Sequence, residues 1–185
     1  MSAWKISKSQ KKLLDTLFAD IRNPEIKKVI DMGAGRTSIH YLAHRFPKNI
    51  VQAVVYPGDE RKIQPILECV PEKNYKIIES DIKNFRNRKV DLVLAHLFLG
   101  EAEKFGKNKF ADILASLFSI KTKYLVIINL LFRDKIDYQL LLKGIARKGK
   151  IINIAYQVSE HGDECLGMTI KFGKQGSRLK GRDDK

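Results

Sequence analysis

The stretch of sequence that decides the fold reads KVIDMGAGRTS and runs from Lys28 to Ser38. Its first half is a short apolar run with β-branched residues, which predicts a buried strand. Gly33 and Gly35 follow at once, and a helical spacing of apolar residues begins at Thr37. A glycine-rich turn between a strand and a helix lets a ligand approach the backbone, and the helix start offers unpaired N–H groups.

Asp31, two residues before Gly33, narrows the class of ligand. A carboxylate at this place would repel a pyrophosphate seated on the turn, whereas it suits a ligand with a cationic amino group. Dinucleotide-binding turns carry a further glycine at the position that is Ser38 here, and they lack the preceding acid. The turn therefore disfavours a nucleotide-binding oxidoreductase. A tight strand–helix turn without any ligand stays open as an alternative.

Strands and helices alternate along the chain. Expected helices span residues 7–21, 37–46, 60–70, 102–120 and 136–147, and expected strands span 28–32, 50–55, 75–78, 90–95, 124–130, 150–158 and 166–172. Such alternation indicates a parallel sheet with helices on both faces, and the short loop joining the last two strands requires them to be antiparallel. We therefore expect an α/β fold: a three-layer αβα sandwich around a mostly parallel, seven-stranded sheet whose last strand is antiparallel.

The chain of 185 residues fits a single domain, which we expect to cover residues 1–172. Residues 173–185 are polar, basic and rich in glycine, and we expect them to form a flexible tail. No apolar stretch approaches the roughly 20 residues that a membrane span needs. The two cysteines, Cys69 and Cys165, form no metal-binding or redox motif, which is typical of a reducing compartment and predicts a cytoplasmic protein.

The formal net charge of +14 predicts an attraction for polyanions, so nucleic acid is the first partner to consider. Lysine and arginine are scattered through nearly every segment, and only a clustered face would make a binding site. A small-molecule or protein partner stays open, and the oligomeric state is not predicted. His40 and His44 recur at a spacing that can bind metal, but no acidic partner accompanies them in the sequence, so we expect no metal site.

The segment Asp31-Met-Gly33-Ala-Gly35 resembles the first motif of the class I, Rossmann-like methyltransferases that use S-adenosylmethionine. In that family the acid contacts the amino group of the methionine part, and the glycines make room for the cofactor. The resemblance therefore assigns cofactor binding to Asp31, Gly33 and Gly35. The family's frequent third glycine is replaced by Thr37 in this chain.

Two further family positions follow the second and third strands. The family's ribose-binding acid would fall at Tyr56, so the resemblance implies that Asp59 binds the ribose, while Tyr56 stacks on adenine or offers one hydroxyl contact. Asp81 and Ile82 match the acid that accepts from the adenine amino group and the apolar residue that packs on the ring. The alternative for Asp81 is a cap of the turn toward Lys83.

The fourth strand ends at Ala95-His96, which resembles the family's strand end beside the transferred methyl group. Ligands bind at the carboxyl ends of strands in open α/β sheets, so both residues are expected at the cofactor. His96 is our candidate catalytic residue, as a general base, and its alternative is a packing or cofactor-shaping role. The chain lacks the Asn/Asp-Pro-Pro-Tyr/Phe motif and the Pro-Cys or Thr-Cys pair of two nucleic-acid-modifying subgroups.

The sequence thus predicts a methyltransferase that uses S-adenosylmethionine on an acceptor it does not identify, with RNA or another nucleic acid among the candidates. The alternative is a non-catalytic Rossmann-like protein that keeps the fold and binds polyanions. Tyr56, in the place of the ribose-binding acid, and the missing third glycine motivate that alternative.

Overall fold

A computed structural model of the chain describes residues 6–103, 107–131, 136–159 and 162–173. The elements are, in chain order, α1 (Lys8–Phe18), η1 (Asn23–Glu25), β1 (Val29–Met32), α2 (Arg36–Arg45), β2 (Val51–Val55), α3 (Glu60–Cys69), β3 (Tyr75–Glu79), η2 (Ile82–Phe85), β4 (Leu92–His96), α4 (Phe98–Glu103), α5 (Lys107–Ser119), β5 (Tyr124–Leu130), α6 (Tyr138–Lys148), β6 (Gly149–Val158) and β7 (Glu164–Phe172).

The seven strands form one sheet in the order β3-β2-β1-β4-β5-β7-β6. The pairs from β3 to β5 are parallel, and β7 runs antiparallel to both β5 and β6. The strand order reverses at β1, which has β2 on one side and β4 on the other. In such sheets the carboxyl ends of the strands at the reversal are where ligands bind. The predicted seven-stranded sheet with an antiparallel last strand is confirmed.

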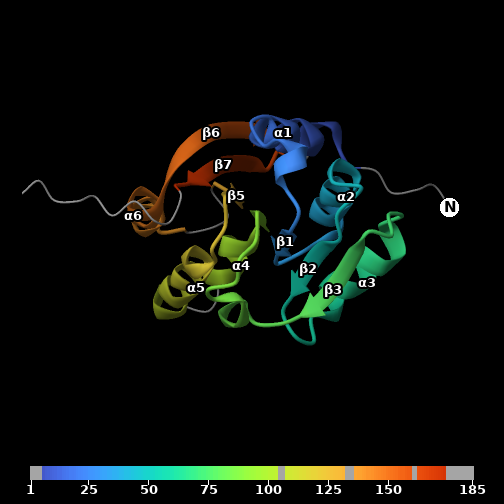
Figure 1. The fold of residues 1–185 in the computed structure, drawn as a ribbon, viewed down its shortest axis with the longest axis horizontal. Helices are drawn as coiled ribbons and strands as arrows, with labels where there is room; N and C mark the ends of the chain where they lie inside the picture. Colours follow the sequence, from blue (N-terminus) through green and yellow to red (C-terminus); the bar gives the residue numbers. More distant parts are fainter. Residues whose placement is uncertain (1–5, 104–106, 132–135, 160–161, 174–185) are drawn as a thin grey trace, which may run out of the picture.

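Helices cover both faces of the sheet, as predicted for a three-layer sandwich (Figure 1). Successive strand residues point to opposite faces, so Val29 of β1 belongs to one hydrophobic core and Ile30 to the other. The first core includes residues of α1, α2 and α3, and the second includes residues of α5 and α6. Every residue of β1 is buried, which is typical of a central strand covered on both sides.

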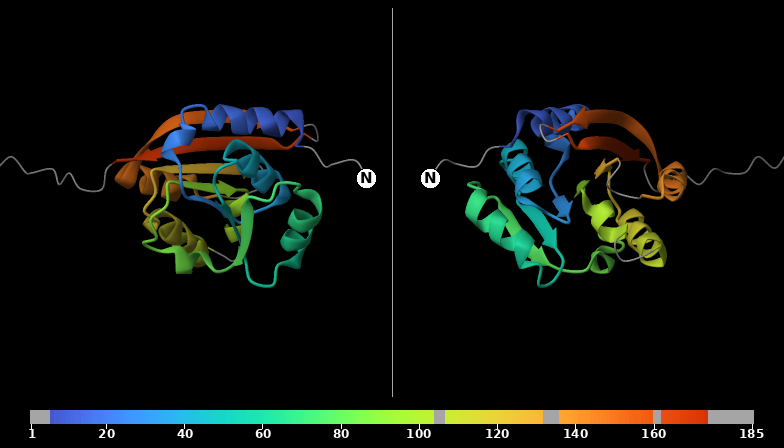
Figure 2. Two further views of the ribbon diagram at one scale, coloured as in Figure 1. Left: turned by 45° about the vertical axis from the view of Figure 1, so that its right-hand side comes forward. Right: turned by 180° about the vertical axis from the view of Figure 1, so that it is seen from behind.

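The opening helix α1 is anchored to the strands at the far end of the chain (Figure 2). Ser7 caps the helix by accepting a hydrogen bond from the Gln10 N–H at 3.2 Å. The carbonyl of Leu17 accepts from the Thr169 hydroxyl at 2.6 Å, and Leu17 itself is fully buried. Together with Asn153, whose amide donates to α1 at 2.6 Å, these contacts join α1 to β6 and β7.

The structure corrects one expected helix and leaves one prediction outside its range. The helix expected over 102–120 is two helices, α4 and α5, and the segment 104–106 between them lies outside the described residues. Helix α3 continues through Pro65 as predicted. The tail beyond Gly173 also lies outside the described residues. Within the described part of the chain, no helix combines the length and the apolar character that crossing a bilayer requires.

We predict that Gly167→Ala destabilises the protein by about 1–3 kcal/mol, because the new methyl group overpacks the seam between α1 and β7. A Cβ on Gly167 would lie 2.3 Å from a methyl carbon of Leu17. Gly173→Ala is the matched control, since a Cβ there meets no atom within 4 Å. Urea unfolding measures both variants, and equal stability of the two would contradict the tight docking of α1.

Candidate functional site

A hydrogen-bonded turn joins the end of β1 to the start of α2. Gly33 has φ +68°, a backbone conformation that side-chain-bearing residues rarely adopt. The Ser38 hydroxyl accepts from the Gly35 N–H at 3.2 Å and donates to an Asp31 carboxylate oxygen at 2.5 Å. One side chain therefore ties the glycine turn, the helix start and the strand together.

Asp31 is fully buried, and only one of its carboxylate oxygens is used. Oδ2 accepts from Ser38, while Oδ1 has no hydrogen-bond partner within the described residues. Burial raises the pKa of Asp31 to about 7, although the Ser38 hydrogen bond and the charge of Lys62 each lower it. A buried carboxylate with an unused acceptor is suited to bind a cation, because burying an unpaired charge is costly.

Lys62 extends from α3 to this turn. Its ammonium lies 3.4 Å from the Gly33 carbonyl oxygen. Its positive charge lowers the pKa of both Asp31 and His96. One ammonium group on α3 therefore acts on side chains at the ends of β1 and β4. The sequence pattern had not pointed to Lys62, since nothing in a helix of mixed polarity marks one lysine among several.

His96 is the last residue of β4 and is half-buried. Burial, with the charge of Lys62 adding to it, lowers the pKa of His96 to about 4, so the imidazole is neutral near pH 7. The following residue, Leu97, has φ +56°, a conformation that costs a residue with a side chain roughly 1–2 kcal/mol. The Leu97 N–H donates to the Ile128 carbonyl at 2.8 Å, which fixes this strained exit from the strand. Ala95, the neighbour of His96, is fully buried.

The two glycines of the turn have different surroundings. A Cβ on Gly33 would lie 2.9 Å from the ring of Phe98, so this aromatic side chain covers the first glycine. A Cβ on Gly35 would meet no atom within 4 Å, so the second glycine opens onto free space. Any ligand therefore approaches the turn at Gly35 and meets Phe98 beside Gly33.

The residues expected to bind ribose lie at the end of β2. Tyr56 is 62% exposed, which leaves its ring available to a ligand. Asp59 precedes α3 and accepts from Arg61 Nε at 3.2 Å. The Gly58 N–H donates to Glu79 at 2.9 Å, so the adjacent end of β3 holds this turn in place.

The residues expected to bind adenine lie just beyond β3. Asp81 accepts from the Lys83 N–H at 2.9 Å and caps η2, which is the alternative role considered for it. That bond leaves the second carboxylate oxygen for other donors. Ile82 is buried in the core beneath α5. Asp59 and Asp81 each accept hydrogen bonds from groups of their own loop. In contrast, the charge of Lys62 acts on both Asp31 and His96.

Asn129, near the end of β5, is a second fully buried polar residue with unused hydrogen-bonding groups. Neither its amide nitrogen nor its oxygen has a partner within the described residues. The expected strand over 124–130 contains Asn129, and the strand pattern alone does not indicate that its side chain is buried.

Within the described part of the chain, no three His, Cys, Asp or Glu side chains are grouped to hold a metal ion. His40 binds Glu72 instead, at 2.7 Å between Nδ1 and the carboxylate.

We predict that the free energy of unfolding of the wild type, relative to that of Asp31→Asn, decreases as the pH rises from 4 to 7. The difference between the two proteins isolates Asp31, because the lowered pKa of His96 gives the opposite pH dependence in both. The pKa of Asp31 is about 7 in the folded protein and 3.8 as an ordinary aspartate, so its contribution is full below pH 3.8 and lost by pH 7. At about 1.4 kcal/mol per pKa unit, the loss amounts to about 4 kcal/mol. Urea unfolding across this pH range measures it, with Asp20→Asn as the control at an exposed position. A wild-type profile that matches Asp31→Asn would contradict the burial of an ionisable Asp31.

A second prediction concerns Asn129→Leu, which we expect to stabilise the protein by about 1–3 kcal/mol, since it removes buried polar atoms without partners at nearly constant size. The matched control is Asn74→Leu, because the Asn74 amide donates to three backbone carbonyls. That control should destabilise the protein in the same thermal unfolding experiment. A loss of stability in both variants would mean that Asn129 has a partner of its own.

Comparison with known proteins identifies the fold. No protein-family profile and no curated protein matches the sequence. Among solved structures, the chain is similar to a TehB-like S-adenosylmethionine-dependent methyltransferase from Corynebacterium glutamicum, with 17% identity, a TM-score of 0.61, and coverage of 93% of this chain and 91% of the other.

Two further solved structures are similar. The magnesium protoporphyrin IX methyltransferase ChlM from Synechocystis, solved with bound S-adenosylmethionine, has 13% identity and a TM-score of 0.69, with 90% of this chain and 79% of the other covered. The 16S rRNA methylase RmtB has 17% identity and a TM-score of 0.61, with 89% and 62% covered. The chain has the Rossmann-like fold of the class I S-adenosylmethionine-dependent methyltransferases.

Proposed function

We propose that the protein binds S-adenosylmethionine at the carboxyl edge of β1 and β4 and transfers its methyl group to an acceptor. The observation that carries the proposal is the buried Asp31 carboxylate with an unused oxygen beside a glycine turn open at Gly35. The amino group of S-adenosylmethionine is the kind of cation that this carboxylate accepts. The fold, shared with enzymes that use this cofactor, supports the same choice.

Each predicted residue has a role in this proposal. Asp31 binds the amino group of the cofactor, and the backbone at Gly33 and Gly35 lies along its methionine part. The Lys62 ammonium already lies beside Asp31 and the Gly33 carbonyl, so the amino group of the cofactor takes its place as the neighbouring cation.

The nucleoside part extends toward the ends of β2 and β3. Tyr56 is exposed for stacking and Asp59 binds the ribose, while Asp81 accepts from the adenine amino group with the oxygen that its cap leaves unused. Ile82 supplies the apolar surface under the ring. Tyr56 stands where the family has its ribose-binding acid. We therefore expect the affinity for S-adenosylmethionine to depend strongly on Asp31.

The bound cofactor supplies an electrophilic methyl group, and the end of β4 faces the acceptor. Ala95 leaves room there, and His96 is the candidate catalytic residue. Its pKa of about 4 keeps the imidazole neutral near pH 7, so a ring nitrogen is able to accept a hydrogen bond from an acceptor group. Proton abstraction by His96 requires that the bound acceptor raises this pKa toward neutrality. The acceptor is unassigned by this site, because proteins of this fold include enzymes for a porphyrin and for rRNA.

The second candidate is a non-catalytic protein that keeps the fold and binds polyanions. The exposed Tyr56 in place of an acid and the Phe98 ring over Gly33 favour it, since both weaken a cofactor site. In both readings we assign the function to residues 1–172 as one domain. We also propose a cytoplasmic location, because Cys69 and Cys165 are not joined to each other by a disulfide.

Calorimetric titration with S-adenosylhomocysteine tests the proposal. We expect Asp31→Asn to weaken binding at least about tenfold, since a single lost charge-assisted hydrogen bond is worth about 1.5–3 kcal/mol. Wild-type affinity should rise from pH 6 to pH 8 as Asp31 ionises, and that rise should vanish in Asp31→Asn. No detectable binding by the wild type, or equal binding by both proteins, would overturn the proposal.

Gly35→Ala separates cofactor contact from folding. The backbone at Gly35 is extended, with φ −139°, and its Cβ would enter open space, so alanine leaves the fold intact. We expect weaker binding of S-adenosylhomocysteine with little change in melting temperature. Gly173→Ala is the control. Transfer of labelled methyl from S-adenosylmethionine to RNA or protein fractions, lost in His96→Ala, would favour the enzyme over the non-catalytic alternative.

A further inference from the structure

A row of lysines lies at the edge of the sheet opposite to the proposed cofactor site. Parallel strands begin at one edge, and lysines stand at these beginnings. We define the basic edge as six exposed lysines: Lys27, Lys28, Lys89, Lys121, Lys150 and Lys171.

The strand register places these lysines in a row. Lys28 directly precedes β1, and Lys89 pairs with Lys121 in a short parallel bridge before β4 and β5. Lys171 of β7 lies opposite Tyr124, the first residue of β5, and on its other side it pairs with Lys150 of β6. The row therefore crosses five neighbouring strands.

The length of the row suits a nucleic-acid backbone. Neighbouring strands lie about 4.8 Å apart, so five strands span about 19 Å. The long side chains of the six lysines extend the reach of the row beyond this width. If each lysine contacts one phosphate, about six phosphates of one strand are bound.

The lysines of the basic edge are not neutralised by acids. None of the six side chains has an ion pair in the described part of the chain. Two acids lie among them, Glu25 and Asp91. Lys123 binds Asp91 at 2.8 Å, and the N–H groups of Lys27 and Lys28 donate to it at 3.0 Å. Glu25 also acts on Lys123, whose pKa it helps to raise.

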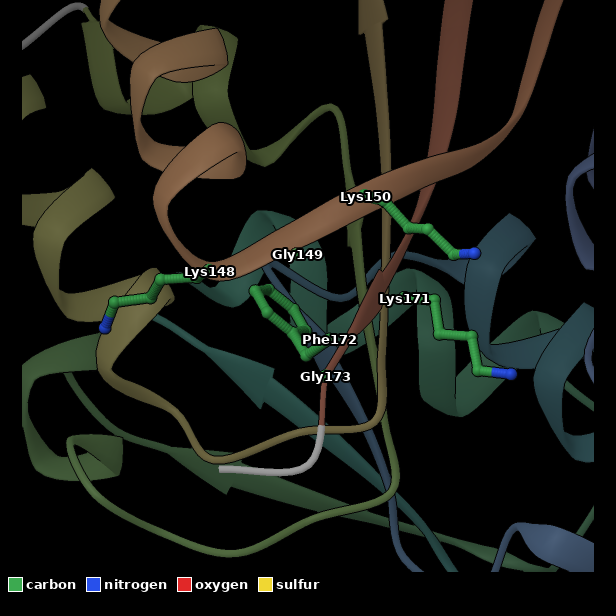
Figure 3. A pocket seen from close by; sticks show the side chains of 6 residues that line it. All are labelled: Lys148, Gly149, Lys150, Lys171, Phe172 and Gly173. Carbon is green, nitrogen blue, oxygen red and sulfur yellow. The ribbon is translucent and has the colours of Figure 1, made fainter. Parts of the chain in front are cut away.

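A hollow of about 360 Å³ lies at one end of the basic edge, lined by Lys148, Gly149, Lys150, Lys171, Phe172 and Gly173. Figure 3 shows the ammonium groups of Lys150 and Lys171 extending to one side and that of Lys148 to the other. Lys148 donates to the Phe118 carbonyl at 2.9 Å, which accounts for its direction. Because the ammonium groups diverge, the hollow suits a chain of phosphates passing along the edge better than one small anion.

The opposite edge has a different charge. Acids follow β2 and β3 and begin β7: Asp59, Glu60, Glu79, Asp81, Asp163 and Glu164. Arg61, Lys62 and Lys83 lie among them. A polyanion is therefore drawn to the basic edge rather than to the carboxyl edge of the sheet.

We propose that the basic edge binds the phosphate backbone of a nucleic acid, separately from the proposed cofactor site. An anionic membrane is disfavoured, because surface-binding segments of that kind combine cations with exposed apolar anchors. Among the exposed large apolar side chains of the described residues, Ile50 lies on this edge, beside Lys28. The others lie on α3, α6 and β6 and at Tyr56.

Fluorescence anisotropy with a labelled 20-nucleotide RNA of mixed sequence tests the proposal. With about six phosphate contacts to a single strand, affinity should fall roughly 300-fold between 50 and 200 mM salt. The variant Lys28→Glu, Lys89→Glu, Lys121→Glu should lose at least about tenfold in affinity, and the corresponding Gln variant should lose less.

The matched control is Lys8→Glu, Lys12→Glu, Lys143→Glu, which changes the net charge equally at exposed positions of α1 and α6. It should bind RNA with near-wild-type affinity. Equal weakening in both triple variants, or binding to anionic phosphatidylserine vesicles without binding to RNA, would overturn the proposal. Titration with S-adenosylhomocysteine in the same variants reports on folding and on the cofactor site separately, so failure of one proposal leaves the other testable.

Discussion

The hydrogen bond between Ser38 and the buried Asp31 holds the site in one arrangement. A carboxylate in the middle of an apolar sheet is costly unless it is protonated, hydrogen-bonded or paired with a cation. Here Ser38 supplies the hydrogen bond and links strand, glycine turn and helix, while Lys62 supplies a cation from a third element. The second Asp31 oxygen has no hydrogen-bond partner within the described residues, and under the proposed function the amino group of the cofactor supplies one.

The two edges of the sheet differ in the charge of the side chains that they carry. The carboxyl edge combines Asp31, a neutral His96 and several acids around a site for a small cationic group, whereas the amino edge carries lysines in a row. A net charge of +14 is therefore not a uniform property of the surface. The division separates small-molecule recognition from attraction of a polyanion, and each can change without disturbing the other.

Hydrophobic periodicity predicted the seven strands and their directions because central strands are buried on both faces and read as short apolar runs. The glycine turn with Asp31 was predicted from local sequence, since backbone conformation and strand order fix where it lies. Lys62 and Phe98 were missed, because each reaches the turn from an element distant in sequence. The expected single helix over 102–120 is two helices, since a continuous apolar pattern does not mark the break between α4 and α5.

The position of β7 inside the sheet has a consequence for how the chain folds during its synthesis. The strand made last lies between β5 and β6, and α1, made early, docks on β6 and β7. During synthesis, the apolar side of α1 that packs on β6 and β7 therefore stays exposed until Phe172, the last residue of β7, has left the ribosome. Contacts this distant along the chain slow folding, because the long loop between them must close before they form.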